Sequence, residues 1–233
     1  QKNLLDNYWV KARFDDPEIK PFTLKYGPKS KETAITTAIL EKGSSKSCLT
    51  TIFGRYSGQW KIDHVFNGWL TLENKDVFEW LEEAKKWIDN EDYVMATYCI
   101  QVCYWLLEPV PTIWRYKNRS DVLDISQDLN RKINRELRNM YIDEISTKPK
   151  ILDFYPIMNL DSICPGVTYY TKVSLSDTVA IQNECSQLDR FFTQYYKNLN
   201  SNSIYVRIVD NDDPWEEPEN SIVLFRKLNK SNL

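Results

Sequence analysis

The chain has 233 residues, 42% of them hydrophobic and 27% charged, which is enough for one large folded domain or two small ones with a sizeable core. Its net charge of −3 offers no basic surface for nucleic acid, so we expect no nucleic-acid partner. Glycine is scarce, at 6 residues, which argues against a phosphate-binding loop. No apolar run reaches the ~20 residues that a transmembrane helix needs.

The first third of the chain predicts a β-sheet. Three stretches rich in β-branched and aromatic residues follow one another between turn signals: residues 33–41, 48–56 and 60–69. The turn segments GSSKS and SGQ between them suit hairpin connections. Two candidate edge strands precede them, at residues 8–14 and 22–26. We therefore expect a curved antiparallel sheet within residues 1–75.

His64 is the single histidine of the chain and lies in the third of these stretches. Side chains alternate between the two faces of a regular strand, so four residues are expected to share one apolar face: Trp60, Ile62, His64 and Phe66. The neighbouring Asp63 is expected to point to the other face. His64 is then either a structural residue of the core or of a cavity wall, with one hydrogen-bond partner, or a ligand-contacting or catalytic residue in a concave pocket.

The same region resembles the closing strands of the cone-shaped NTF2-like domains over residues 8–72. The resemblance rests on a curved antiparallel sheet that ends in a hairpin with the sequence GQWKID. It implies a small molecule held inside the cone. In that case the side chains of Trp60, Ile62, His64 and Phe66 would contact the ligand.

The middle of the chain predicts helices that pack on this sheet, within residues 76–148. Apolar residues recur at helical spacing over residues 76–88 and again over residues 93–107, where two prolines end the pattern. A third helix is expected over about residues 120–141. The first two helices resemble one tetratricopeptide-type helical hairpin over residues 76–109, through their large and small residues: Trp80, Ala84, Trp87, Tyr93 and Ala96.

The last third, residues 149–233, predicts a second α+β unit. Four stretches have the composition of strands: residues 151–157, 167–175, 203–210 and 221–228. A helix with a regular apolar stripe separates the second from the third and is expected to begin at Ser176 or Asp177. The order strand–strand–helix–strand–strand predicts an antiparallel sheet with one covering helix, so the fold class of the chain is α+β.

The loop between the last two strands, residues 210–220, carries six carboxylates, one tryptophan and two prolines. It lacks the glycine that an EF-hand loop needs, since Trp215 stands in that place. General acid–base chemistry by a pair of these carboxylates stays open, because spacing alone fixes no geometry. The loop is otherwise either solvated or a contact site for a basic partner, formed by Trp215, Asp212 and Asp213.

The five cysteines have an uneven spacing that does not predict a disulfide framework: Cys48, Cys99, Cys103, Cys164 and Cys185. No CxxC or HxxxH pattern supplies a set of metal ligands. We therefore expect buried free thiols, no metal site and no cofactor.

Sequence motifs for a nucleophile elbow, a P-loop and dinucleotide binding are absent, and a single histidine limits acid–base and metal chemistry. We therefore expect a binding protein that is not an enzyme, with an unknown protein or small molecule as its partner. In one hypothesis, aromatic-rich surfaces on the helical hairpin or the acidic loop bind another macromolecule, which predicts exposed Trp or Tyr clusters and an empty sheet interior. In the other, the N-terminal sheet encloses a small molecule, which predicts a cavity with His64 pointing into it.

The Asn-, Lys- and Tyr-rich composition resembles that of proteins from the bacterial cell envelope, and the chain begins with Gln1 rather than Met. From these two features we expect that an N-terminal segment has been removed and that the protein resides in the periplasm or cell envelope. The sequence predicts no particular oligomeric state.

Overall fold

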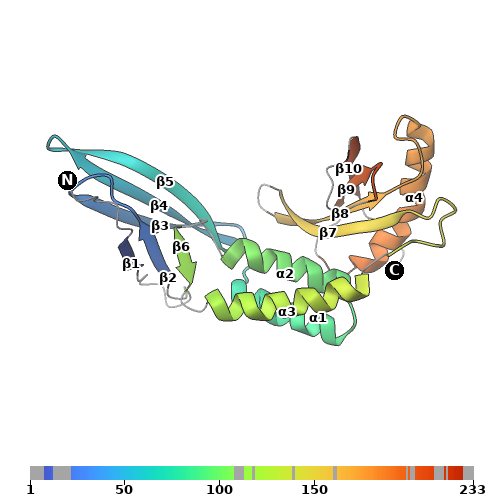
Figure 1. The fold of residues 1–233 in the computed structure, drawn as a ribbon, viewed down its shortest axis with the longest axis horizontal. Coiled ribbons are helices and arrows are strands. Elements are labelled where there is room, and N and C mark those ends of the chain that lie inside the picture. The colour runs from blue at the N-terminus through green and yellow to red at the C-terminus, as the bar shows by residue number, and fades with distance from the viewer. Residues whose placement is uncertain are drawn as a thin grey trace. The chain divides into compact units, whose positions relative to one another are not determined.

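The computed structural model describes residues 8–12, 22–107, 113–116, 119–137, 140–159, 162–197, 199, 203–212, 218 and 220–227. These residues form ten strands and four helices, and the predicted α+β class is confirmed (Figure 1). The chain divides into two compact units, residues 1–81 with 102–127 and residues 82–101 with 128–233. The boundaries predicted from the sequence, at residues 75 and 148, separate the helical middle of the chain from the strands on either side. The two compact units have other boundaries, because residues of the central helices are shared between them.

Three long strands of the first unit form an antiparallel sheet in the order β3–β4–β5: β3 (Thr33–Lys42), β4 (Ser45–Tyr56) and β5 (Gln59–Thr71). Both predicted hairpins are confirmed. The β4–β5 turn consists of Ser57 and Gly58, with φ angles of 50° and 83°. Two successive positive φ angles are typical of a type I′ turn, whose twist matches that of a hairpin, so this short turn suits the pairing of two long strands.

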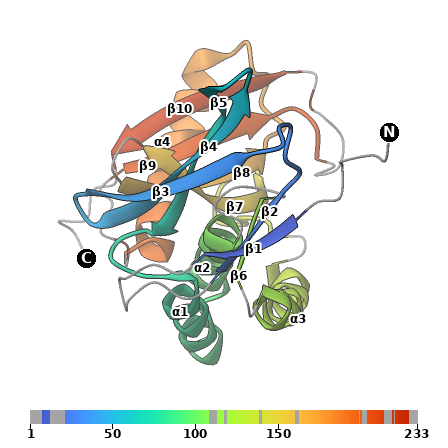
Figure 2. The same ribbon diagram turned by 90° about the vertical axis from the view of Figure 1, so that its left-hand side faces the viewer.

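A second antiparallel sheet of the first unit has the order β1–β2–β6: β1 (Tyr8–Ala12), β2 (Phe22–Tyr26) and β6 (Trp114–Tyr116). It faces the inner side of the first sheet, because the Tyr26 side chain contacts both Asp63 and His64 of β5 (Figure 2). Leu24 from β2 and Ile52 from β4 are almost completely buried. The core of the first unit therefore includes the space between these two sheets.

The three predicted central helices are confirmed, with these bounds: α1 (Val77–Asp89), α2 (Tyr93–Leu107) and α3 (Arg119–Leu137). α1 begins with a capping box, in which the Asp76 carboxylate accepts from the N–H groups of Phe78 and Glu79 while the Glu79 carboxylate accepts from the Asp76 N–H. The Cys103 thiol donates to the Val77 carbonyl at 3.5 Å, which joins the end of α2 to the start of α1. The pair is therefore antiparallel, and its assignment to the tetratricopeptide class stays a prediction. None of the described helices is both long and apolar enough to cross a membrane.

The second unit contains a four-stranded sheet in the order β10–β9–β8–β7: β7 (Lys150–Asn159), β8 (Ser162–Tyr170), β9 (Ser203–Val209) and β10 (Ser221–Lys227). β8 and β9 are parallel, so the prediction of a wholly antiparallel sheet is wrong. The reason is helix α4 (Thr178–Tyr195), which carries the chain from the end of β8 back to the start of its neighbour β9. Such a crossover makes the two strands parallel. β8 also begins before the predicted segment 167–175, at Ser162, and ends within it, at Tyr170.

Helix α4 covers one face of this sheet (Figure 1). The apolar stripe predicted for the helix supplies its buried side chains: Ile181, Cys185, Leu188 and Phe192. The opposing side chains alternate along β8 and β9 and are fully buried: Val167, Tyr169, Val206 and Ile208. The Tyr169 hydroxyl lies 3.3 Å from the Cys185 thiol, which places the two layers in contact. All five cysteines are free and buried, as predicted.

β7 forms one edge of the four-stranded sheet, and other parts of the second unit occupy that edge. The Gln101 side-chain amide of α2 donates to the Phe154 carbonyl at 2.9 Å. Nearer the start of the strand, the Ile151 N–H donates to the Met140 carbonyl at 2.8 Å. Backbone groups at two points along this edge are therefore already hydrogen-bonded.

Candidate functional site

The alternation of side chains predicted for β5 is interrupted at Asp63. The strand pairing shifts between Ile52, which lies opposite His64, and Phe53, which lies opposite Ile62. Asp63 is therefore an extra residue in β5. A bulge of this kind offsets the two-residue period, so residues on its two sides exchange faces relative to a regular strand.

The bulge separates the four residues predicted to line a ligand cavity. His64 and Phe66 lie on the inner face and are half-buried, and their rings stack with centroids 5.5 Å apart. Trp60 and Ile62 lie on the outer face, where they are 50% and 61% exposed. The expected common face is therefore wrong, and ligand contact by these residues stays a prediction.

Asp63 also turns to the inner face, where its carboxylate accepts hydrogen bonds from two tyrosines. The Tyr56 hydroxyl donates at 2.7 Å and the Tyr26 hydroxyl at 3.4 Å. The bond to Asp63 raises the pKa of Tyr56 to about 12, because an ionised phenol could no longer donate it. The Tyr26 ring also meets the His64 ring edge to face, with centroids 5.8 Å apart. Asp63 therefore lies on the same side as His64, contrary to the expectation.

The acidic loop contributes one described residue to the predicted partner contact. Trp215 and Asp213 lie outside the described residues. Asp212 is exposed, and its carboxylate lies 3.8 Å from the Lys150 ammonium group, which also donates to its carbonyl at 3.2 Å. The described part of this site is therefore engaged with a lysine of the same unit.

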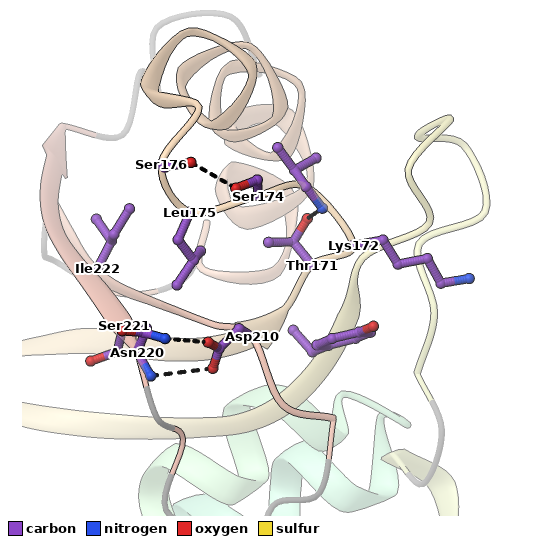
Figure 3. Close-up of a pocket in the computed structure, with 11 residues that line it drawn as sticks. Thr171, Lys172, Ser174, Leu175, Ser176, Asp210, Asn220, Ser221 and Ile222 are labelled. Atoms are coloured by element: carbon purple, nitrogen blue, oxygen red, sulfur yellow. Dashed lines mark hydrogen bonds between the residues drawn. The ribbon is translucent and has the colours of Figure 1, made fainter.

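A cavity of about 710 Å³ opens in the second unit, at the C-terminal ends of the parallel strands β8 and β9 (Figure 3). The loop from β8 to α4 forms one wall, and residues around the start of β10 form another. Eleven of the described residues line it: Tyr170, Thr171, Lys172, Val173, Ser174, Leu175, Ser176, Asp210, Asn220, Ser221 and Ile222. In open sheets with parallel strands, ligands bind outside the carboxyl ends of the strands, because the connecting loops leave a crevice there.

The start of the β8–α4 loop is fixed by a buried threonine. The Thr171 hydroxyl accepts from the Val173 N–H at 3.0 Å and donates to the Glu184 carboxylate of α4 at 3.0 Å. The Thr147 hydroxyl donates to the same carboxylate. Thr171 and Glu184 are both almost completely buried, so this network anchors the cavity wall to the helix behind it.

The end of the same loop is fixed at the start of α4. The Ser174 carbonyl accepts from the Asp177 N–H at 2.9 Å, and the Asp177 carboxylate caps the helix by accepting from the Ala180 N–H at 3.0 Å. The Ser174 and Ser176 hydroxyls lie 2.8 Å apart and are exposed. Because each hydroxyl has one proton and two lone pairs, both keep hydrogen-bonding capacity toward the cavity.

The opposite wall is formed by a carboxylate and an amide that hold each other. The Asp210 carboxylate accepts from the Asn220 side-chain amide at 2.9 Å and from the Asn220 N–H at 3.3 Å (Figure 3). These hydrogen bonds lower the pKa of Asp210, so the group is ionised at neutral pH. The Asn220 amide keeps its carbonyl oxygen and its second N–H, and Asp210 keeps further lone pairs. These groups match a ligand that both donates and accepts hydrogen bonds.

Among the described residues of the lining the formal charge is balanced, with one lysine, Lys172, and one aspartate, Asp210. Five of the lining residues carry a hydroxyl group: Tyr170, Thr171, Ser174, Ser176 and Ser221. Histidine and cysteine are absent from this lining, and the described residues contain no group of three or more His, Cys, Asp or Glu side chains suited to a metal ion. The site is therefore built for hydrogen bonding.

Comparisons of the chain with models of known protein families, with curated proteins and with solved structures give no match. The interpretation of the site therefore rests on its geometry. Sequence reasoning missed this cavity because its walls come from three separate segments, residues 170–176, Asp210 and residues 220–222. The signal that was present is a serine-rich turn between a strand and the N-terminus of a helix.

Proposed function

We propose that the protein is a non-catalytic binding protein whose cavity takes a small, uncharged, polyhydroxylated ligand of the saccharide class. The observation that carries this proposal is the Asp210–Asn220 pair facing a loop of exposed serine hydroxyls across a cavity of about 710 Å³. A saccharide presents hydroxyl groups that donate and accept at neighbouring positions, which is what this set of side chains complements.

The charges around the cavity favour a neutral ligand. An anion would face the ionised Asp210, and the Asp177 carboxylate already occupies the positive end of α4. Lys172, which is among the lining residues, adds a positive charge that disfavours a cation. The negative charge of Asp210 disfavours an anion. The lining therefore favours an uncharged ligand that forms hydrogen bonds.

The apolar part of the lining fits the carbon skeleton of the same ligand class. Leu175 lies between the two hydrogen-bonded pairs, and Ile222 lies on the β10 side (Figure 3). Both are half-buried, as is Tyr170. Small apolar surfaces of this kind can cover the C–H groups of a sugar ring while polar side chains bind its hydroxyls.

Binding rather than catalysis is supported by the state of the carboxylate. The lowered pKa of Asp210 makes it a hydrogen-bond acceptor at neutral pH and a poor general acid. Its two oxygens are held by Asn220, so the group is oriented for recognition. The hypothesis of a ligand cavity around His64 stays a second prediction. Trp60 lies on the other face of the strand, so it would not contribute to that cavity.

The test is a titration with a panel of uncharged saccharides, using methyl glycosides and short oligomers of glucose, galactose, mannose and N-acetylglucosamine, followed by saturation-transfer NMR and calorimetry. Asp210→Asn removes the charge while preserving the shape of the side chain. Loss of charge-assisted hydrogen bonds to the ligand predicts affinity at least ~10-fold weaker. Asp212→Asn is the matched control, because Asp212 lies in the same loop and does not line the cavity.

Three results decide the matter. Saccharide binding that Asp210→Asn weakens and Asp212→Asn leaves unchanged supports the proposal. No binding by any saccharide of the panel overturns it. Equal effects of the two substitutions place the ligand elsewhere and overturn the assignment to this cavity. Thermal unfolding of each variant identifies any loss that comes from unfolding alone.

A further inference from the structure

The outer face of the sheet β3–β4–β5 is almost free of charge. Strand pairing and alternation place two charged side chains on it, one at each end, Lys42 and Arg55. The side chains between them are uncharged: Ala34, Thr36, Ala38, Leu40, Ser47, Leu49, Thr51, Phe53, Trp60, Ile62, Val65, Asn67 and Trp69. We call this set the outer face. The inner side of the same sheet packs against Tyr26, so the two sides have different environments.

Large apolar side chains on the outer face are exposed. Ile62 is 61% exposed, Val65 53% and Leu40 46%. Trp60 lies at the β4–β5 end of this face and is 50% exposed. Single exposed apolar residues are ordinary on a protein surface, but a contiguous group without charges is typical of an interaction site.

The charge pattern fits a second copy of the same face. The charge at the β4–β5 end is that of Arg55, whose guanidinium group is paired with the Glu32 carboxylate at 2.8 Å. Lys42 lies at the opposite end of the face, beside the β3–β4 turn. Two copies brought face to face therefore oppose apolar and neutral side chains over the middle of the face, with charged side chains only at its margins. An interface that a symmetry axis generates requires this kind of self-complementarity.

The size of the face also fits a dimer. Ten residues along each strand at about 3.3 Å, across three strands about 4.8 Å apart, give a face on the order of 500 Å² per copy. Two copies would bury about 1,000 Å², which is near the lower limit of specific protein interfaces. The expected dimer is therefore weak and depends on concentration.

We propose that the outer face binds the outer face of a second copy, so that two three-stranded sheets stack about 10 Å apart as in a β-sandwich. This inference places an interaction surface on the N-terminal sheet, and it is independent of the saccharide cavity. Ile62 and Val65 lie among its most exposed side chains, so a charge at either position meets the apolar partner surface directly.

The test is sedimentation velocity of the full chain over about 1 µM to 1 mM, the range that a small interface requires. We expect a reversible monomer–dimer equilibrium. Ile62→Glu should weaken it at least ~10-fold, because a carboxylate would be buried without a partner. Ile62→Thr, which keeps a β-branched residue in the strand, should weaken it less. Val223→Glu is the matched control, since Val223 is a 50% exposed strand residue of the second unit.

A monomer over the whole range overturns the proposal. A dimer that Ile62→Glu and Ile62→Thr leave intact, or that Val223→Glu disrupts equally, assigns the contact to another surface and also overturns it. Circular dichroism of each variant verifies the fold. Because the readout is molecular mass without added ligand, failure of this proposal is distinguishable from failure of saccharide binding.

Discussion

Gly166 in β8 provides a quantitative test of the packing of the second unit. A Cβ atom at this position would lie 2.5 Å from the nearest ring carbon of Tyr155, which stands opposite it on β7. Ordinary carbon contacts begin near about 3.5 Å, so the ring would have to move by about 1 Å. The Thr168 hydroxyl donates to the Tyr155 hydroxyl at 3.3 Å, and that bond resists the movement.

Gly166→Ala should therefore destabilise the unit. Overpacking costs about 1–3 kcal/mol, and alanine regains about 0.5–1 kcal/mol because glycine loses more conformational freedom in a strand. A net loss of about 1–2 kcal/mol corresponds to a Tm lower by roughly 2–8 °C for a chain of this size. Urea unfolding measures the free energy, and thermal unfolding measures Tm.

The matched comparison is Gly166→Ala in a Tyr155→Ala background. Without the ring, the added methyl group has space, so its cost should vanish or become a small gain. An equal cost in both backgrounds would refute the steric explanation. A neutral or stabilising Gly166→Ala in the otherwise unchanged protein would show that the Tyr155 ring does not lie over the glycine.

Three further predictions concern the second unit and the thiols. Asp177→Ala removes the cap that accepts from the Ala180 N–H, and urea unfolding should show a loss of about 1 kcal/mol; an unchanged midpoint would contradict the cap. Arg226→Lys replaces a guanidinium that binds both oxygens of Asp189, at 2.8 and 2.6 Å, and should cost about 0.5–1.5 kcal/mol by the same assay. Burial raises the pKa of the Cys103 thiol to about 12, and all five cysteines are buried, so a thiol reagent should modify the native protein much more slowly than the denatured one at pH 8.

The sequence predicted those elements whose signals are local. Periodic apolar residues identified helices α1 to α4, and the SGQ turn placed the β4–β5 hairpin. The bulge at Asp63 could not be predicted, because it depends on how β5 pairs with β4 and on two tyrosines that bind the inserted carboxylate. A one-residue offset was enough to move Trp60 and Ile62 to the face opposite His64.

Two errors in the second unit also come from non-local contacts. The strand predicted at residues 167–175 begins at Ser162 in the structure and includes Pro165, which lies opposite Pro156 on β7. The paired stretch with β9 begins only at Gly166, so Pro165 need not donate to that strand. The cavity was missed for a similar reason, since Asp210 and Asn220 meet the β8–α4 loop only after β9 and β10 have paired.

The hydrogen bond from Gln101 to the Phe154 carbonyl has a consequence for colloidal behaviour. An open strand edge is a template on which strands of other molecules can add, and β7 would offer one. The Gln101 amide of α2 binds the Phe154 carbonyl in the middle of β7 and so blocks the addition of another strand there. Among the described strands, the other edge of the sheet is β10, which ends in Arg226 and Lys227, charges that discourage such addition. Until Gln101 reaches Phe154 during folding, β7 stays open to foreign strands, so docking of this part of α2 also protects the unit against aggregation.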